Sequence, residues 1–249
     1  AECCGCLAVA RYWLGDLEGS AQASEQRLAF ARQTGDPYES RHVYTWLHVV
    51  RSMQGRQAEA DQWLAQAQAM MAHVESPEPK AWLAFVRGAG ATMRGDYATG
   101  EAHLAEAIAA FRSMGPGALV WYLGMYGLAL AGAGKRAEAL AALDELEGLL
   151  AGLPNEGMAV AEPRTYLLAA ALALADRGRI DRYAPLLAPF AGQFHDLLPE
   201  RLLGEVAITR RAWDEAEQLL AQAEAAARRI GLAFELPAVL AAQGRLAQA

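Results

Sequence analysis

The chain has 249 residues, of which 54% are hydrophobic and 20% charged, and its net charge is −7. Nucleic-acid-binding domains normally carry a basic surface, so this acidic balance argues against direct contact with DNA or RNA. No apolar run is long enough to cross a membrane, and the start lacks the basic stretch and apolar run of a signal peptide. The composition therefore predicts a cytoplasmic protein that contacts neither nucleic acid nor membrane.

The cysteines are three in number and lie together as Cys3, Cys4 and Cys6. An odd, local cluster does not make a disulfide framework, which favours a reducing compartment. A zinc site would need a fourth ligand from elsewhere, and the nearest histidine in sequence is His42. Packing of small side chains in a terminal helix is the favoured interpretation, so no metal is predicted.

The fold class follows from the apolar residues that are used. Alanine, the best helix former, makes up much of the hydrophobic fraction, and the β-branched residues that favour strands are scarce. The chain is therefore predicted to be all-α.

A short turn motif recurs along the whole chain, and each copy precedes small and apolar residues at helical spacing. The copies begin at Gly15, Gly55, Gly95, Gly134, Gly178, Arg211 and Gly244, at intervals of 40, 40, 39, 44, 33 and 33 residues. A near-constant period in this range is typical of stacked repeat arrays.

Prolines recur between these turns and mark the starts of further helices. In Gly35-Asp36-Pro37 the glycine ends one helix, the aspartate caps the next and the proline occupies its first turn, and Gly115-Pro116 is interpreted in the same way. The expected first helices are 2–14, 38–54, 79–94, 117–133, 161–177, 199–210 and 233–243. The expected second helices are 17–33, 57–73, 97–113, 136–151, 180–194 and 213–230.

The fifth unit departs from this pattern. Pro185 and Pro189 fall inside its second helix, and a long loop, 152–162, precedes the unit. Prolines in a helix interior kink or interrupt it, so we expect a bend near 150–195.

The residues after each turn resemble the tetratricopeptide repeat, a pair of antiparallel helices. With the turn glycine counted as position 15, the third unit has small residues at Gly88, Gly100 and Ala107 and bulky ones at Tyr97 and Leu104, as the repeat requires. The resemblance covers essentially the whole chain and implies a right-handed α-solenoid of about six to seven helix pairs, forming one domain over residues 1–249.

The interval of about 40 residues exceeds the 34 of the standard repeat. Together with the segment 31–36 (Ala-Arg-Gln-Thr-Gly-Asp), this longer repeat resembles the helical repeat region of large bacterial signalling regulators, of which the maltose-regulator-like (MalT-like) family is the nearest comparison. In such proteins the region lies beside a nucleotide-binding switch module and an effector, for example a LuxR-type DNA-binding domain. This resemblance implies that the chain is part of a longer protein and works with its adjacent domains.

The sequence shows no catalytic pattern. Gly132-Ala133-Gly134-Lys135 lacks the earlier glycine and the following hydroxyl of a phosphate-binding loop. The histidines lie in different expected helices without metal-ligand spacing, and there is no Gly-x-Ser-x-Gly element. We therefore predict that the chain is not an enzyme and uses no cofactor.

The tetratricopeptide resemblance implies where a partner would bind. In that family, positions 2, 5, 9, 12 and 13 of each first helix point into the concave face. Carried over by position, the strongest candidates are aromatic, polar and methionine residues: Tyr12, Trp13, His42, Thr45, Trp82, Phe85, Met93 and Trp121. Exposed aromatics in a concavity are suitable anchors for a helix or an apolar ligand. Two alternatives stay open, namely that these residues pack between repeats and that another part of the parent protein fills the groove.

The leading hypothesis is a non-catalytic interaction and sensor module that binds a protein segment or a small-molecule effector in its concave groove, within a bacterial signal-transduction or transcription regulator. A constitutive protein–protein scaffold is the first alternative. A helical enzyme with an apolar pocket is the second, and the absence of aspartate-rich metal motifs disfavours it.

Overall fold

A computed structural model describes residues 2–71, 76–115, 119–153 and 157–249, and this part of the chain is built from helices and their connections. An isolated β-bridge between His195 and Leu197 is the only β pairing among the described residues. The predicted all-α class is confirmed. Within the same ranges, no helix combines the length and apolarity needed to cross a membrane.

The helices follow one another as antiparallel pairs. The first eight are α1 (Glu2–Trp13), α2 (Leu17–Thr34), α3 (Pro37–Met53), α4 (Gln57–Met71), α5 (Pro77–Met93), α6 (Tyr97–Met114), α7 (Leu119–Gly132) and α8 (Arg136–Leu150). The later ones are α9 (Met158–Ala173), α10 (Arg177–Leu187), the 3-10 helix η1 (Ala188–Phe190), α11 (Pro199–Thr209), α12 (Trp213–Ile230) and α13 (Glu235–Ala247). Up to α8 the expected bounds agree closely with these. Parts of the expected helices 57–73 and 117–133, and the expected start at Pro116, lie outside the described residues.

The turns form as the local signals predict. Asp16, Asp36, Asp96 and Asp176 each accept a hydrogen bond from the backbone N–H three residues further on, which caps the following helix. Gly15 and Gly95 stand just before two of these caps with φ of 75° and 79°. Only glycine adopts this left-handed conformation without a steric penalty, so these glycines fix the chain reversal.

Two of the expected turns are wrong. The fifth turn residue is Ala175, with φ 51°, whereas Gly178 lies inside α10. The side chain of Asp176 caps α10 there, so the local hydrogen bonding sets the turn ahead of the glycine. Gly244 is not a turn at all, because α13 runs through it to Ala247.

The predicted interruption of the fifth unit's second helix is confirmed. The expected helix 180–194 ends as α10 at Leu187, with Pro185 inside its last turn and Pro189 in η1. In the same unit the expected long loop is shorter than predicted, since α9 begins at Met158, and residues 154–156 lie outside the described part. Pro163 lies within α9 rather than at its start.

Small residues allow the helices of a pair to approach closely. A Cβ placed on Gly88 of α5 would lie 2.6 Å from Cγ of Leu104 and 3.0 Å from the backbone oxygen of Gly100, both on α6. Gly204 on α11 and Leu220 on α12 repeat this contact at 2.8 Å. The ordinary pairs are therefore held by close apolar packing, as the small and bulky positions of the sequence predict.

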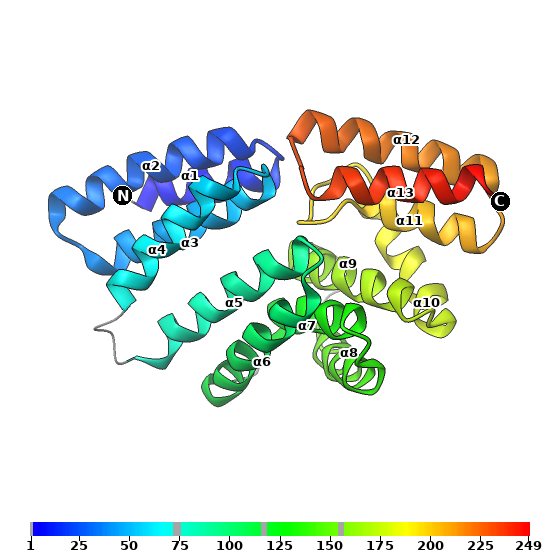
Figure 1. Cartoon of the computed structure of the whole chain (residues 1–249), viewed down its shortest axis with the longest axis horizontal. Coiled ribbons are helices and arrows are strands. Elements are labelled where there is room, and N and C mark those ends of the chain that lie inside the picture. The colour runs from blue at the N-terminus through cyan, green and yellow to red at the C-terminus, as the bar shows by residue number, and fades with distance from the viewer. Residues whose placement is uncertain (1, 72–75, 116–118, 154–156) are drawn as a thin grey trace.

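The first and last helix pairs meet, so the pairs close around a central region (Figure 1). The backbone N–H of Ala233, after α12, donates to the carbonyl of Met53 at the end of α3 over 2.9 Å. Ile230 packs on Gly15, and one apolar cluster contains Leu47 of α3 together with Ala227 of α12. We call this contact between α1–α3 and the end of α12 with its following loop the seam.

Candidate ligand-binding site

The segment 191–198, which follows the interrupted helix, is called the inner segment below. It makes a tight reversal in which the backbone N–H of His195 donates to the carbonyl of Leu197 over 3.3 Å, and that of Leu197 to the carbonyl of His195 over 2.6 Å. Asp196 stands at its tip with φ 61°, a conformation that aspartate tolerates better than most residues. The reversal leaves the carboxylate of Asp196 free to bond to residues outside the segment.

The carboxylate of Asp196 joins two distant helices. Its Oδ1 accepts a hydrogen bond from the hydroxyl of Tyr12 on α1, and its Oδ2 accepts one from Tyr166 on α9 over 2.9 Å. Phe194 adds an edge-on contact to Tyr12, with ring centroids 5.2 Å apart. The inner segment therefore ties the first helix to the ninth.

The electrostatics of this link disfavour ionised carboxyls. Burial raises the pKa of Glu162 on α9 well above its ordinary value, and the charge of Asp196 raises it further. Burial also raises the pKa of Asp196, against the opposing effect of the hydrogen bonds from Tyr12 and Tyr166. Burial thus shifts both pKa values toward the neutral form, because the ionised forms lose their hydration there, whereas the two tyrosine hydroxyls favour the ionised form of Asp196.

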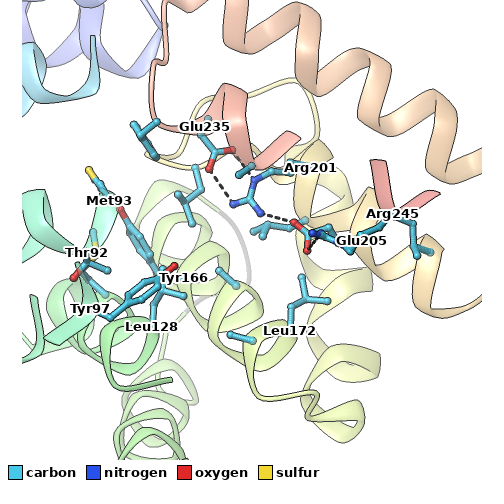
Figure 2. A pocket seen from close by; sticks show the side chains of 18 of the residues that line it. Thr92, Met93, Tyr97, Leu128, Tyr166, Leu172, Arg201, Glu205, Glu235 and Arg245 are labelled. Atoms are coloured by element: carbon cyan, nitrogen blue, oxygen red, sulfur yellow. Dashed lines mark hydrogen bonds and ion pairs between the residues drawn. The ribbon is translucent and has the colours of Figure 1, made fainter. Parts of the chain in front are cut away.

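A cavity of about 560 Å³ opens on the same central region, and Figure 2 shows it from close by. Residues of α5, α7, α9, α11 and α13 surround it, together with Tyr97 at the start of α6 and Leu197 of the inner segment. Its apolar wall includes Met93, Tyr97, Met125, Leu128, Leu172, Leu202, Ile208 and Phe234. Ligand cavities of proteins commonly have this size and this predominantly apolar lining.

A chain of ion pairs forms the polar wall of the cavity (Figure 2). Arg201 makes two 2.9 Å hydrogen bonds to the carboxylate of Glu235 and one of 2.6 Å to Glu205, and Arg245 continues the chain to Glu205 at 2.9 Å. Burial alone would lower the pKa of Arg201, but Glu235 and Glu205 raise it above its ordinary value. The charges of this wall therefore neutralise one another and fix α13 against α11.

The structure places the first two predicted binding residues against the inner segment. Tyr12 is almost fully buried and hydrogen-bonded to Asp196. The Trp13 ring is half-buried, 6.2 Å from the ring of His195. Part of the expected groove is thus covered by the chain itself.

Three further predicted residues come together on α3 and α5. The indole N–H of Trp82 donates to the hydroxyl of Thr45 over 3.0 Å, and Trp82 stacks on Phe85 with centroids 5.5 Å apart. Thr45 is buried, whereas both aromatic rings are half-buried. Tyr122 of α7 completes this aromatic cluster at 4.5 Å from Phe85.

The last three predicted residues lie apart from one another. Met93 lines the cavity of Figure 2. His42 is half-buried beside a narrow crevice that Val9 and Trp46 also line. Trp121 is half-buried against the core around α7.

The charged wall was missed by the sequence prediction, although a signal for it exists. Arg201 and Glu205 precede the turn residue Arg211 at the same offsets as Phe85 and Ala89 precede Gly95. In the sixth unit the inward positions 5 and 9 of the repeat are therefore these two charged residues. Glu162 and Asp196 had no such signal, because their proximity depends on the path of the inner segment.

No protein-family model and no curated protein matches the chain. Among the described residues, no group of three or more histidine, cysteine, aspartate and glutamate side chains is arranged to hold a metal ion.

Proposed function

We propose that the chain is a non-catalytic helical-repeat module, a tetratricopeptide-like right-handed α-solenoid, that binds a small-molecule effector on its concave side. The module would belong to a bacterial signal-transduction or transcription regulator and act on its adjacent domains. The observation that carries the proposal is the cavity of about 560 Å³ between α5, α7, α9, α11 and α13.

The positions of the cavity residues support the repeat interpretation. Thr92 and Met93 precede the turn at Gly95 at the offsets by which Ile208 and Thr209 precede the turn at Arg211, and all four line the cavity. When Ala175 is taken as the fifth turn, Leu172 and Ala173 fall at these same offsets and also line it. Three units thus contribute the same two positions, as a repeated structure with one inner face would do.

Binding fits the lining better than catalysis does. Arg201 and Glu235, the most deeply buried charged groups of the wall, satisfy each other in a bidentate pair. Such a pair holds its geometry but offers neither a free base nor a free acid. A catalytic group would need a titratable side chain that reaches the substrate.

A small effector fits the central region better than an extended protein segment does. The inner segment already lies against Tyr12 and Trp13, where a segment following the concave face would have to pass. A constitutive scaffold that binds partner chains is the second candidate, and the half-buried aromatic cluster of Trp82, Phe85 and Tyr122 is the surface that favours it.

Fluorescence of the neutral apolar probe N-phenyl-1-naphthylamine tests the cavity. Ala173 is exposed at the cavity wall, so Ala173→Phe should fill the space without disturbing the core and weaken probe binding about tenfold, or about 1.4 kcal/mol. Ala137→Phe, at an exposed site on α8, is the matched control and should bind as the wild type does. Equal affinity in all three proteins would contradict the cavity assignment.

Two further measurements separate the regulator from the scaffold and test the predicted groove. The gene sequence on either side of this chain should encode a switch module or an effector domain if the chain belongs to a regulator. For a partner chain that binds in the predicted groove, the pair Trp82→Ala and Trp121→Ala should lower the affinity, whereas binding in the cavity, which neither residue lines, should be unchanged. An unchanged affinity for the partner chain would show that these two residues lie outside the binding surface.

A further inference from the structure

A second cavity, of about 310 Å³, lies at the seam and away from the cavity of Figure 2. It is lined from three parts of the chain: Trp13 and Leu14 at the end of α1, Gly192, Gln193, Phe194 and His195 of the inner segment, and Arg229 and Ile230 at the end of α12. The cavity therefore exists only where the first and last helix pairs meet.

His195 gives this cavity a polar group without a partner. The residue is only 2% exposed, and neither ring nitrogen has a hydrogen-bond partner among the described residues. Its ring instead contacts Phe190 edge-on at 5.5 Å and Trp13 at 6.2 Å. Leaving a buried polar group unpaired costs about 1–3 kcal/mol, so a structural role alone does not account for a histidine here.

The protonation of His195 determines what it can bind. Burial lowers the pKa of His195 to about 4, so the ring is neutral near pH 7. A neutral imidazole offers one N–H donor and one acceptor nitrogen. It can therefore donate to an anionic oxygen without bringing a charge of its own.

Arg229 supplies positive charge to the same cavity. Its side chain is exposed and makes no hydrogen bond or ion pair with the described residues, in contrast to the adjacent Arg228, which bonds to Glu224. An opposing charge is that of Glu200, whose buried carboxyl interacts electrostatically with Arg229 and keeps its Oε2 unpaired. Burial raises the pKa of Glu200, which weakens that opposition.

The remaining walls are apolar and partly open to solvent. Leu14 is 80% exposed, although it is a large hydrophobic residue, and Trp13 and Ile230 are half-buried. An apolar surface beside an unpaired guanidinium and an unpaired imidazole matches a ligand with an apolar body and an anionic head.

We propose that the seam cavity binds a small amphipathic carboxylic acid, with its carboxylate toward Arg229 and His195 and its apolar body against Trp13, Leu14 and Ile230. Guanidinium groups bind carboxylates through paired hydrogen bonds. Because the ligand touches both sides of the seam, its binding stabilises the closed arrangement of the helix pairs. This site is separate from the cavity of the proposed function and does not depend on it.

Isothermal titration of the whole chain with 1-naphthoate at pH 7 tests the proposal. The neutral isostere 1-naphthamide and the cation 1-naphthylmethylammonium are the comparison probes, and naphthoate should bind at least about tenfold more tightly than either. Equal affinity for the amide, no measurable binding of naphthoate, or tighter binding of the cation would each overturn the carboxylate assignment.

Variants identify the residues. Arg229→Gln should weaken naphthoate binding about tenfold without changing the melting temperature, and Arg228→Gln is the matched control that should bind as the wild type does. His195→Phe should lose most of the binding while the protein melts at the same or a higher temperature, because two unpaired buried nitrogens are removed. Unchanged binding in Arg229→Gln, or a large loss in Arg228→Gln, would overturn the site.

Discussion

The contacts within helix pairs and the contacts across the centre of the molecule are built in different ways. Within the pair α5–α6, Gly88 lets Leu104 approach, and the interface is small and apolar. Around the centre, apolar contacts such as that of Ile230 with Gly15 are joined by polar, largely buried links: Asp196 with Tyr12 and Tyr166, and Arg201 of α11 with Glu235 of the neighbouring α13. Apolar packing depends on volume, whereas the polar links depend on individual partners and on their protonation.

The two kinds of contact should respond to different changes. The stability of an apolar pair interface depends little on pH, but an added methyl group disturbs it, since a well-packed interior has no spare space. The polar links across the centre respond to charge and pH, and they adjoin both proposed binding sites. Four substitutions test this contrast, in descending order of expected effect.

Glu235→Ala should have the largest effect, a loss of about 3–5 kcal/mol in unfolding free energy, because it leaves Arg201 buried without its bidentate partner. Urea unfolding measures it. Arg245→Ala, at the exposed end of the same chain of ion pairs, should cost less than about 1 kcal/mol. Arg201→Met combined with Glu235→Leu should restore most of the stability, and a double variant as unstable as Glu235→Ala would contradict this account.

Gly88→Ala should destabilise the protein by about 1–3 kcal/mol, because the new methyl group would meet Leu104 and the backbone of α6. Gly148→Ala on α8 is the matched control. Its Cβ would meet nothing within 4 Å, so helix propensity alone acts and should stabilise by about 0.5–1 kcal/mol. Thermal melting of both variants measures the contrast, and a shift of the same sign in both would refute it.

Thr45→Val should cost about 1 kcal/mol, because the indole N–H of Trp82 loses its acceptor. A neutral hydrogen bond is thus expected to matter less than the buried ion pair of Arg201 and Glu235. Thr34→Val, at the exposed end of α2, is the control for the same change in side chain. Urea unfolding measures both variants. A loss of unfolding free energy in Thr45→Val as large as that in Glu235→Ala would contradict this ranking.

Glu162→Gln comes last in this order, because its effect on the unfolding free energy is small at low pH. The effect should grow as the pH rises. The folded pKa of Glu162 is raised, so its contribution to stability is complete below its ordinary pKa of 4.5 and is lost as the pH rises through the folded value. The variant cannot ionise and should therefore gain stability relative to the wild type as the pH increases. Unfolding free energies measured from pH 4 to 8 test this. The control Glu162→Asp, which can still ionise, should keep the pH dependence of the wild type. A difference between Glu162→Gln and the wild type that does not change with pH would contradict the prediction.

The pair contacts were predictable from sequence because their signals are local. Caps such as Asp96, turn glycines such as Gly95 and the small residue at Gly88 act on neighbours one helix away. Ala175 shows the limit of this reasoning, since a capping aspartate after it set the turn while a nearby glycine lay inside the helix.

The contacts across the centre were not predictable in the same way. The meeting of Asp196 with Tyr12 depends on where the whole series of pairs returns, and small rotations at each pair determine that place. Of the eight predicted binding residues, Met93 lines the cavity of Figure 2. The contacts of Tyr12 with Phe194, of Trp13 with His195 and of Phe85 with Tyr122 required the structure.

The hydrogen bond between Tyr12 and Asp196 has a consequence for how the protein folds. It joins residues 184 positions apart, whereas the helix pairs join near neighbours along the chain. Contacts of large sequence separation pay their loop-closure entropy before they gain anything, and local contacts form sooner. We expect the pairs to form first and the seam to close last, so that the cavity at the seam is the latest part of the molecule to exist and the first to open.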